Sequence, residues 1–158
     1  MKKKMKGKNY FTAHCLLPTK QMTQKIFTTG YTAKDINDLR PMLDALEAVL
    51  VDIRFAPYSQ VLHWRQIYLK VLLGSKYLHI PKLGNRTDKE DKITIQNLQL
   101  GLETVFSLSK NAILMCACET AEKCHRRVII AELKKRNIET EEILTWKTRD
   151  SSQQSKLF

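Results

Sequence analysis

Short apolar runs and longer apolar stripes alternate along the chain between residues 25 and 147. Runs rich in β-branched and aromatic residues predict strands, because such side chains suit a pleated, partly buried surface. Five such runs are present, at 26–29, 48–53, 77–80, 112–116 and 142–146. The fourth is apolar almost throughout, which is typical of a strand buried on both faces.

Apolar residues between these runs recur three and four positions apart, which predicts four helices. The first stripe follows a residue that can cap a helix, Asp35. The stripes are Ile36, Leu39, Leu43 and Leu46; Val61, Trp64, Tyr68 and Val71; Ile95, Leu98, Leu102, Val105 and Leu108; and a helix over 123–136 with Ile129 and Leu133. Parallel strands need helical crossovers, so the alternation predicts an α/β fold: three α/β/α layers around a mainly parallel sheet of about five strands.

The length and the charge distribution divide the chain into three parts. We expect a single α/β domain over 25–147, a basic flexible arm over 1–24 and a polar tail over 148–158. The formal net charge is +11, but residues 1–25 hold seven lysines and no acid, which leaves 20 basic and 16 acidic residues elsewhere. A block of like charge contacts phosphates non-specifically, so nucleic acid is a partner that the arm can bind.

Neither a targeting segment nor a membrane span is expected. No run approaches the roughly 18 apolar residues of a span, and no apolar core of a signal peptide follows the first lysines. Cys116, Cys118 and Cys124 lie within nine residues, unlike the cysteines of a secreted disulfide framework. These features predict a cytoplasmic protein with reduced thiols and no membrane partner.

Polar and reactive residues gather where the predicted strands end. In open α/β sheets, ligands bind outside the carboxyl ends of the strands, at a switch in strand order. This rule selects four candidate catalytic residues, Cys116, Cys124, His79 and His125, and four candidates for binding an anion or ligand, Arg54, Arg126, Tyr31 and Ser59.

The thiols and imidazoles each have two interpretations. Cys116 ends a buried strand, where packing explains a cysteine as well as function does. Cys124 lies where a helix is predicted to begin, beside His125 and Arg126, and both the helix dipole and the cations favour a lowered thiol pKa. His79 and His125 are either packing or capping residues, or proton carriers that titrate near neutrality.

Arg54 directly follows an apolar strand, where a permanent charge needs a partner. One interpretation is an ion pair with Asp52 or Asp35. The other is an anion clamp formed together with Arg126. The sequence leaves both open.

These residues also carry a resemblance to a known family. In order along the chain, the matching blocks are Phe27–Thr32; Asp52–Arg54 with Pro57 and Ser59; Tyr77 with His79–Pro81 and Leu83–Gly84; and Leu114–Cys116 followed by Cys124–Arg126. Over about residues 26–146 the chain resembles the domain of unknown function 488 family. The resemblance implies an α/β fold and an enzyme built on two cysteines, without a settled activity. Two positions depart from the pattern: Asn85 stands where a second glycine is common, and Cys118 where an acid or a small residue is common.

The resulting hypothesis is an enzyme that acts on an anionic small molecule or nucleotide-like substrate through a cysteine nucleophile, a histidine proton carrier and an arginine clamp. The alternatives are a non-catalytic module that binds nucleotide or nucleic acid, and a partner-binding scaffold. No cofactor is expected, since the glycine-rich dinucleotide and triphosphate motifs are absent. Cys116, Cys118, Cys124 and His125 are acceptable zinc ligands, but their spacing is not that of a standard zinc motif, and no metal is expected.

Overall fold

A five-stranded, all-parallel sheet lies at the centre of the protein, in the order β3-β2-β4-β1-β5. The computed structural model describes residues 23–87 and 92–147, so the predicted arm (apart from residues 23 and 24) and the predicted tail lie outside the described residues. The strands are β1 (Ile26–Gly30), β2 (Ala48–Asp52), β3 (Tyr77–His79), β4 (Asn111–Cys116) and β5 (Thr140–Glu142).

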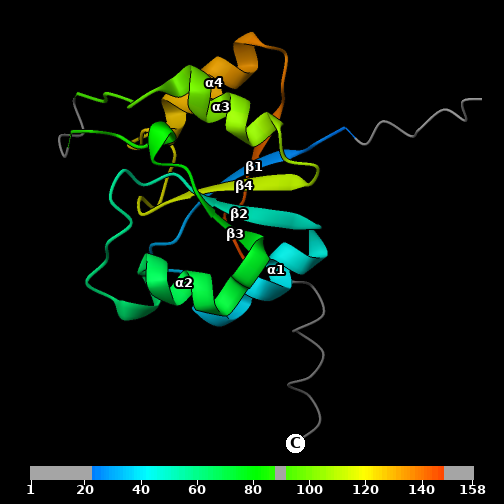
Figure 1. Ribbon diagram of the computed structural model, residues 1–158, viewed down its shortest axis with the longest axis vertical. Coiled ribbons are helices and arrows are strands. Elements are labelled where there is room, and N and C mark those ends of the chain that lie inside the picture. The colour runs from blue at the N-terminus through cyan, green and yellow to red at the C-terminus, as the bar shows by residue number, and fades with distance from the viewer. Residues whose placement is uncertain (1–22, 88–91, 148–158) are drawn as a thin grey trace, which may run out of the picture.

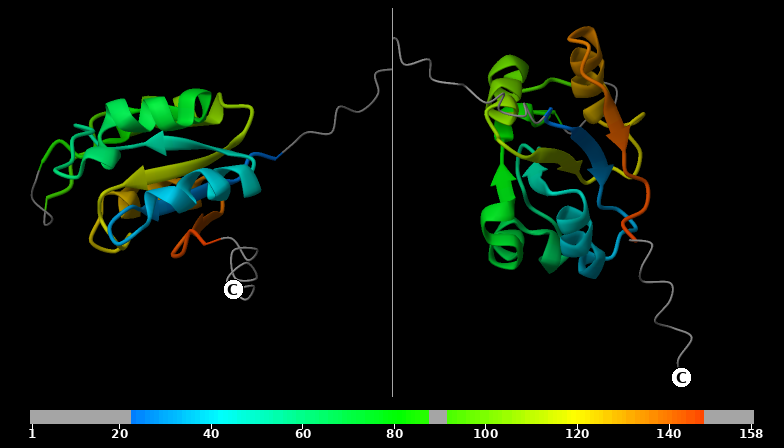
Figure 2. Two further views of the ribbon diagram at one scale, coloured as in Figure 1. Left: turned by 90° about the horizontal axis from the view of Figure 1, so that it is seen from below. Right: turned by 90° about the vertical axis from the view of Figure 1, so that its right-hand side faces the viewer.

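Four α-helices cover the sheet in two layers: α1 (Leu39–Ala45) and α2 (Gln66–Leu73) on one face, and α3 (Leu98–Phe106) and α4 (Arg126–Lys135) on the other (Figure 1). In Figure 2, the left view looks onto the face of the sheet that α1 and α2 cover, and the right view shows the row of strands between the two helix layers. The described residues also form four short 3-10 segments: Ile36–Asp38, Leu62–Trp64, Gly74–Lys76 and Pro81–Leu83. The predicted three-layer α/β/α fold is therefore confirmed.

Each face of the sheet has its own apolar core. The strand residues alternate between the two, as the pleat requires: Val49, Val51 and Leu114 pack toward α3 and α4, while Leu50 and Ile113 pack toward α1 and α2. Cys116 and Cys124 belong to the core beneath α3 and α4. No helix within residues 23–87 and 92–147 has the length and apolarity needed to cross a bilayer.

The predicted stripe of the second helix was wrong. Only Trp64 of its four residues is buried, and the side chain of Val71 is 83% exposed. The chain is extended at Arg65 and the α-helix begins at Gln66. The predicted residues before and after Arg65 therefore do not belong to one helix and cannot share one helix face. Within α2 the buried residues are Leu69 and Leu73.

The fifth strand was predicted at 142–146, but β5 ends at Glu142, before most of that apolar run. Thr140–Glu142 pair with β1, and after the bond from the Ile143 amide to the Thr28 carbonyl (2.8 Å) the chain leaves the ladder. Trp146 is nevertheless buried, because its indole stands edge-on to Trp64 and its Nε1–H donates to the Thr29 hydroxyl at 2.9 Å. The apolar run therefore covers the core as a loop.

Candidate functional site

The site lies where the chain leaves β2 and β4. These two strands are neighbours, but the chain continues from β2 toward α2 on one face and from β4 toward α4 on the other. Diverging connections of this kind form the crevice in which open α/β proteins bind ligands. A hollow of about 340 Å³ lies here, between the segments that follow β2 and β4 and the segment around Asn85–Thr87.

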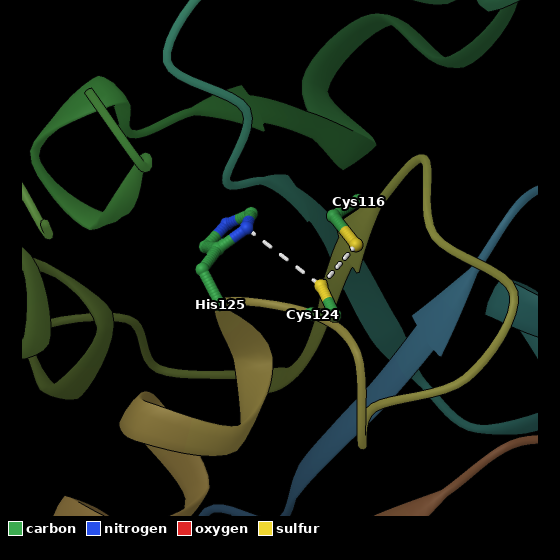
Figure 3. Close-up of side chains that lie close together, drawn as sticks. All are labelled: Cys116, Cys124 and His125. Carbon is green, nitrogen blue, oxygen red and sulfur yellow. Dashed lines mark hydrogen bonds between the residues drawn. The ribbon is translucent and has the colours of Figure 1, made fainter. Parts of the chain in front are cut away.

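Two thiols and an imidazole that line this hollow lie close together (Figure 3). The sulfur of Cys116, the last residue of β4, lies 2.8 Å from that of Cys124. The Cys124 sulfur lies 3.6 Å from His125 Nδ1. Both cysteines are 1% exposed, so only a small reagent that enters the hollow reaches them.

The backbone fixes the tautomer of His125. Its Nε2 lies 3.1 Å from the carbonyl oxygen of Ile53, which only accepts hydrogen bonds, so Nε2 carries the proton. Burial lowers the pKa of His125, which keeps the ring neutral at neutral pH. The Nδ1 lone pair therefore faces the Cys124 sulfur and can accept its proton.

Cys118, the third thiol of the site, is exposed and also lines the hollow. The neighbouring thiols Cys116 and Cys124, together with the positive charge of Arg126, lower the pKa of Cys118. The neighbouring thiols Cys118 and Cys124, together with burial, raise the pKa of Cys116. The most accessible thiol is thus also the one that ionises first.

The expected lowering of the Cys124 pKa is not found. Although hydrogen bonding with Cys116 and with the Arg126 amide lowers it, Cys118 and burial outweigh them, and the pKa of Cys124 is raised. The helix begins at Arg126 rather than at residue 123, so Cys124 precedes the N-cap residue His125. Its contact with the helix N-terminus is a single long bond, 3.4 Å, from the Arg126 amide.

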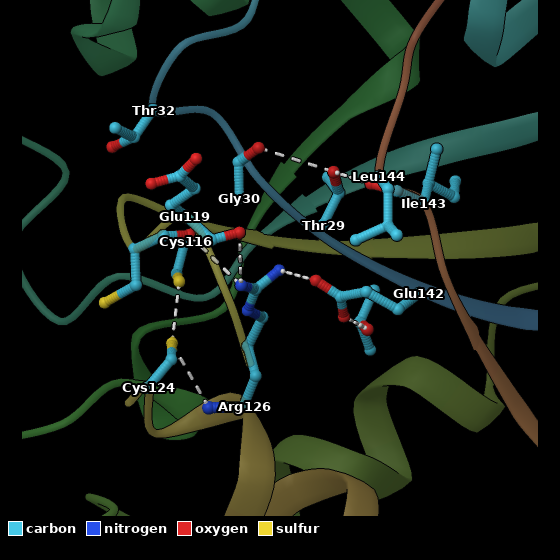
Figure 4. Close-up of polar contacts among 12 residues, drawn as sticks. Thr29, Gly30, Thr32, Cys116, Glu119, Cys124, Arg126, Glu142, Ile143 and Leu144 are labelled. Carbon is cyan, nitrogen blue, oxygen red and sulfur yellow. Dashed lines mark hydrogen bonds and ion pairs between the residues drawn. The ribbon is translucent and has the colours of Figure 1, made fainter. Parts of the chain in front are cut away.

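Arg126 stabilises the loop that carries Cys118 from a buried position outside the hollow (Figure 4). Its guanidinium is fully buried, donates to Glu142 at 2.8 Å, and donates to the carbonyl of Cys118 at 3.1 Å. It therefore connects α4, the end of β5 and the loop after β4. It does not line the hollow, so its positive charge acts on the thiols through the protein rather than by contact with a ligand.

Gly30 lets the loop after β4 approach β1. A Cβ atom at this position would lie 1.6 Å from the carbonyl oxygen of Cys118, and the Tyr31 amide donates to the Cys116 carbonyl at 3.1 Å. Any side chain at position 30 therefore displaces the segment that carries Cys118.

We predict that Gly30→Ala lowers the free energy of unfolding by about 2–3 kcal/mol, because the backbone must shift to relieve the overlap. Urea titration measures the loss. Gly74→Ala is the matched control: no atom obstructs a Cβ there, and only its positive φ of 55° opposes the change, at about 1 kcal/mol. Equal losses in the two variants would contradict the close packing at Gly30.

Arg54 adopts the ion pair that the sequence left open, and its partner is Asp52. The guanidinium meets both carboxylate oxygens, at 2.8 and 2.5 Å, and the Tyr77 hydroxyl donates to the same carboxylate at 2.7 Å. Asp52 is fully buried and Arg54 is 6% exposed. Arg54 lines the hollow all the same, so it presents part of a neutralised pair to a ligand.

The other predicted site residues do not line the hollow. His79 Nε2 lies 2.8 Å from the Arg54 carbonyl, so this histidine positions the segment after β2. Tyr31 stacks on Trp64 and its hydroxyl accepts a 3.4 Å bond from Arg54. The Ser59 hydroxyl accepts a bond from the Val61 amide in its own turn.

Sequence reasoning missed two cations of the hollow and undervalued Cys118. Arg86 and Lys123 line it beside Arg54, and no aspartate or glutamate is among the lining residues within the described part of the chain. Arg86 could have been predicted, because the polar segment around Asn85 follows β3 and therefore lies at the same carboxyl edge of the sheet as the other site residues. The electrostatic character of the hollow is therefore basic.

A metal ion has a partial ligand set here. The ligand atoms of Cys116, Cys124 and His125 lie within 4.8 Å of one another, and the Ile53 carbonyl orients the imidazole as outer partners of metal ligands do. Sulfurs sharing a tetrahedral zinc ion lie about 3.8 Å apart. The 2.8 Å spacing of Cys116 and Cys124 fits direct interaction of the thiols better than joint coordination.

Comparisons with protein-family models, with curated proteins and with solved structures gave no significant match.

Proposed function

We propose that the chain is a thiol-dependent enzyme that acts on a small anionic or nucleotide-like substrate at the hollow between β2 and β4. Cys124 is the nucleophile and His125 Nδ1 the proton acceptor. One observation carries the proposal: the Ile53 carbonyl holds His125 in the tautomer whose lone pair faces the Cys124 sulfur, 3.6 Å away. A nucleophile, a base and a group that orients the base are the parts that nucleophilic catalysis requires.

The charges around the hollow support an anionic substrate. Arg54, Arg86 and Lys123 supply positive charge, and a volume of about 340 Å³ suits a small molecule. The resemblance to the domain of unknown function 488 family belongs to this proposal, since the matching blocks supply Arg54, Cys116, Cys124 and His125.

The role of His125 is tested by alkylation of Cys124 in His125→Gln. Glutamine retains an N–H donor for the Ile53 carbonyl but removes the base. We expect alkylation by iodoacetamide at pH 7, followed by peptide-resolved mass spectrometry, to slow about 100-fold, the lower end of the range for general-base assistance. The difference between the two proteins should shrink at alkaline pH, where the thiol ionises without help.

The pH dependence has a defined direction. Because the pKa of His125 is lowered, its neutral form is present above the ordinary value of about 6.5 and is lost only as pH falls through its folded pKa. Alkylation of Cys124 in the native chain should therefore persist at pH 6–7 and decline in more acidic buffer.

His79→Gln is the matched control, because it keeps a donor for the Arg54 carbonyl outside the hollow. Its Cys124 should react at nearly the native rate. If His79→Gln slows the reaction and His125→Gln does not, the assignment of the base is wrong. If a nucleotide binds equally well to the native chain and to Cys124→Ser, and neither histidine variant alters Cys124, the non-catalytic binding module is the correct alternative.

A further inference from the structure

The three thiols are arranged for a second kind of chemistry, the transfer of two electrons. The sulfurs of Cys116 and Cys124 are 2.8 Å apart, and a disulfide bond of roughly 2.05 Å needs little further approach. This pair is buried, whereas Cys118 is exposed on the same hollow. Nucleophilic attack by Cys124 on a carbon or phosphorus centre uses neither Cys116 nor Cys118.

We infer that Cys118 captures a small anionic disulfide and that Cys124 and Cys116 convert the adduct into a buried Cys116–Cys124 disulfide. The site thereby reduces a disulfide-bonded substrate to two thiols. This inference shares Cys124 with the proposed function but adds two residues and a substrate class to it.

The first step is thiol–disulfide exchange at the surface. The Cys118 thiolate attacks one sulfur of a substrate RSSR, a Cys118–SR bond forms, the S–S bond of the substrate breaks, and one RS⁻ leaves to take a proton from solvent. Exposure and an easily ionised thiol both favour Cys118 as the attacking residue.

The next two steps transfer the disulfide bond from Cys118 to the buried cysteines Cys124 and Cys116. Cys124 gives its proton to His125 Nδ1 and attacks the Cys118 sulfur, which expels the second RS⁻ and leaves a Cys118–Cys124 bond. RS⁻ takes up the proton that His125 holds, so two RSH are released in all. Cys116 then gives its proton to His125, whose ring nitrogen lies within 4.8 Å of the sulfur, and attacks the Cys124 sulfur, which releases Cys118 as a thiolate. His125 passes this proton to solvent and so replaces the one that the first RS⁻ took up. Two protein thiols are oxidised for one disulfide reduced, and a second, low-molecular-weight thiol restores them.

The relative acidities of the thiols favour this direction. In exchange reactions the thiol with the lower pKa leaves faster. Cys118 has a lowered pKa and Cys116 a raised one, so Cys118 is the better leaving group in the last step. The charge of the buried Arg126 lies behind the pair and stabilises a transient thiolate on Cys116 or Cys124.

The basic lining selects the charge of the substrate. Arg54, Arg86 and Lys123 attract a disulfide that carries carboxylates and repel one that carries ammonium groups. Oxidised glutathione and cystamine are suitable probes of opposite charge. Electrostatic steering changes association rates by about 10-fold or more, and added salt weakens it.

The experiment treats the full-length, reduced chain with oxidised glutathione, quenches with N-ethylmaleimide and maps all four cysteines by mass spectrometry. We expect two thiols to be lost, a Cys116–Cys124 linked peptide to appear, and Cys118 to remain alkylatable. Cystamine should oxidise the pair about 10-fold more slowly at low salt. Cys118→Ser should slow oxidation by glutathione about 10-fold.

Cys116→Ser separates this inference from the proposed function. It should halt the reaction as a glutathione adduct or a Cys118–Cys124 bond, while His125-dependent alkylation of Cys124 continues.

The inference is overturned if the native chain accumulates a stable adduct on Cys118 with Cys116 and Cys124 reduced, or if Cys118→Ser oxidises at the native rate. It is equally overturned if the purified chain holds a metal that protects both buried thiols, or if Cys15 supplies the disulfide partner. If His125→Gln leaves Cys124 alkylation unchanged but the linked peptide still forms, the proposed function fails, whereas the inference stands with solvent in place of His125 as the acceptor of the Cys124 proton.

Discussion

Arg126→Ala is expected to lower the free energy of unfolding by about 3–5 kcal/mol, one of the two largest losses that the structure predicts. The substitution removes a fully buried guanidinium, takes away the ion-pair partner of Glu142 and leaves the Cys118 carbonyl without a donor. Urea titration of the purified variant measures the loss. Because the same guanidinium holds the loop that carries Cys118, the variant should also lose the difference in reactivity among the three thiols.

Arg127→Ala is the matched control for this change. Arg127 is the next residue on α4, but its side chain is exposed and donates only to the Glu122 carbonyl. Its replacement should alter stability by no more than about 0.5 kcal/mol. Similar losses in the two variants would show that Arg126 does not support the site.

Asp52→Asn should cost about 3 kcal/mol or more. Asparagine has the volume of aspartate but no charge, so the Arg54 guanidinium would remain buried without a counter-ion, and the loss of one partner of a buried pair costs about 3–5 kcal/mol. Thermal or urea unfolding at pH 7 measures the difference from the native chain.

Tyr77→Phe is the comparison for Asp52→Asn. It removes one neutral donor from the same carboxylate and should cost only about 1 kcal/mol. If both variants lose the same small amount, solvent reaches the pair and Arg54 is available to bind an anion by itself. That outcome would contradict the neutralised pair described here.

The overall architecture could be predicted from the sequence because it depends on the spacing of apolar residues and on the alternation of predicted strands with predicted helices. The buried strands are apolar on both faces, and helices must connect parallel neighbours. The same logic brought Arg54, Cys116, Cys124 and His125 to one edge, and the structure places all four on one hollow.

Details that depend on chain breaks and on tertiary contacts could not be predicted in this way. The stripe of the second helix crossed the extended residue Arg65, and the apolar run that ends at Trp146 packs on the core without pairing as a strand. The pairing of Arg126 with Glu142 joins residues from α4 and β5, which no local pattern links.

The chemistry of the thiols was predicted only in part. Proximity of Cys124 to a helix start suggested a lowered pKa, but its position before the N-cap weakens that effect, and burial together with Cys118 raises the pKa. The sequence marked Cys118 only as a possible zinc ligand and as a departure from the pattern that the chain resembles, although its exposure makes it the most accessible thiol among the described residues. Exposure and sulfur–sulfur distances are set by packing, which the sequence does not state.

The central claim is that a reactive thiol and a basic hollow occupy the same place, and charge-selective alkylation of Cys124 tests it most directly. Iodoacetate carries a negative charge and iodoacetamide none, so the ratio of their rates reports the local potential, with the urea-unfolded chain as reference. We expect this ratio to be at least about 10-fold higher in the native chain at low salt and to fall toward the unfolded value as salt is added. A ratio equal to that of the unfolded chain, at every salt concentration, would show that Cys124 does not lie in a basic hollow.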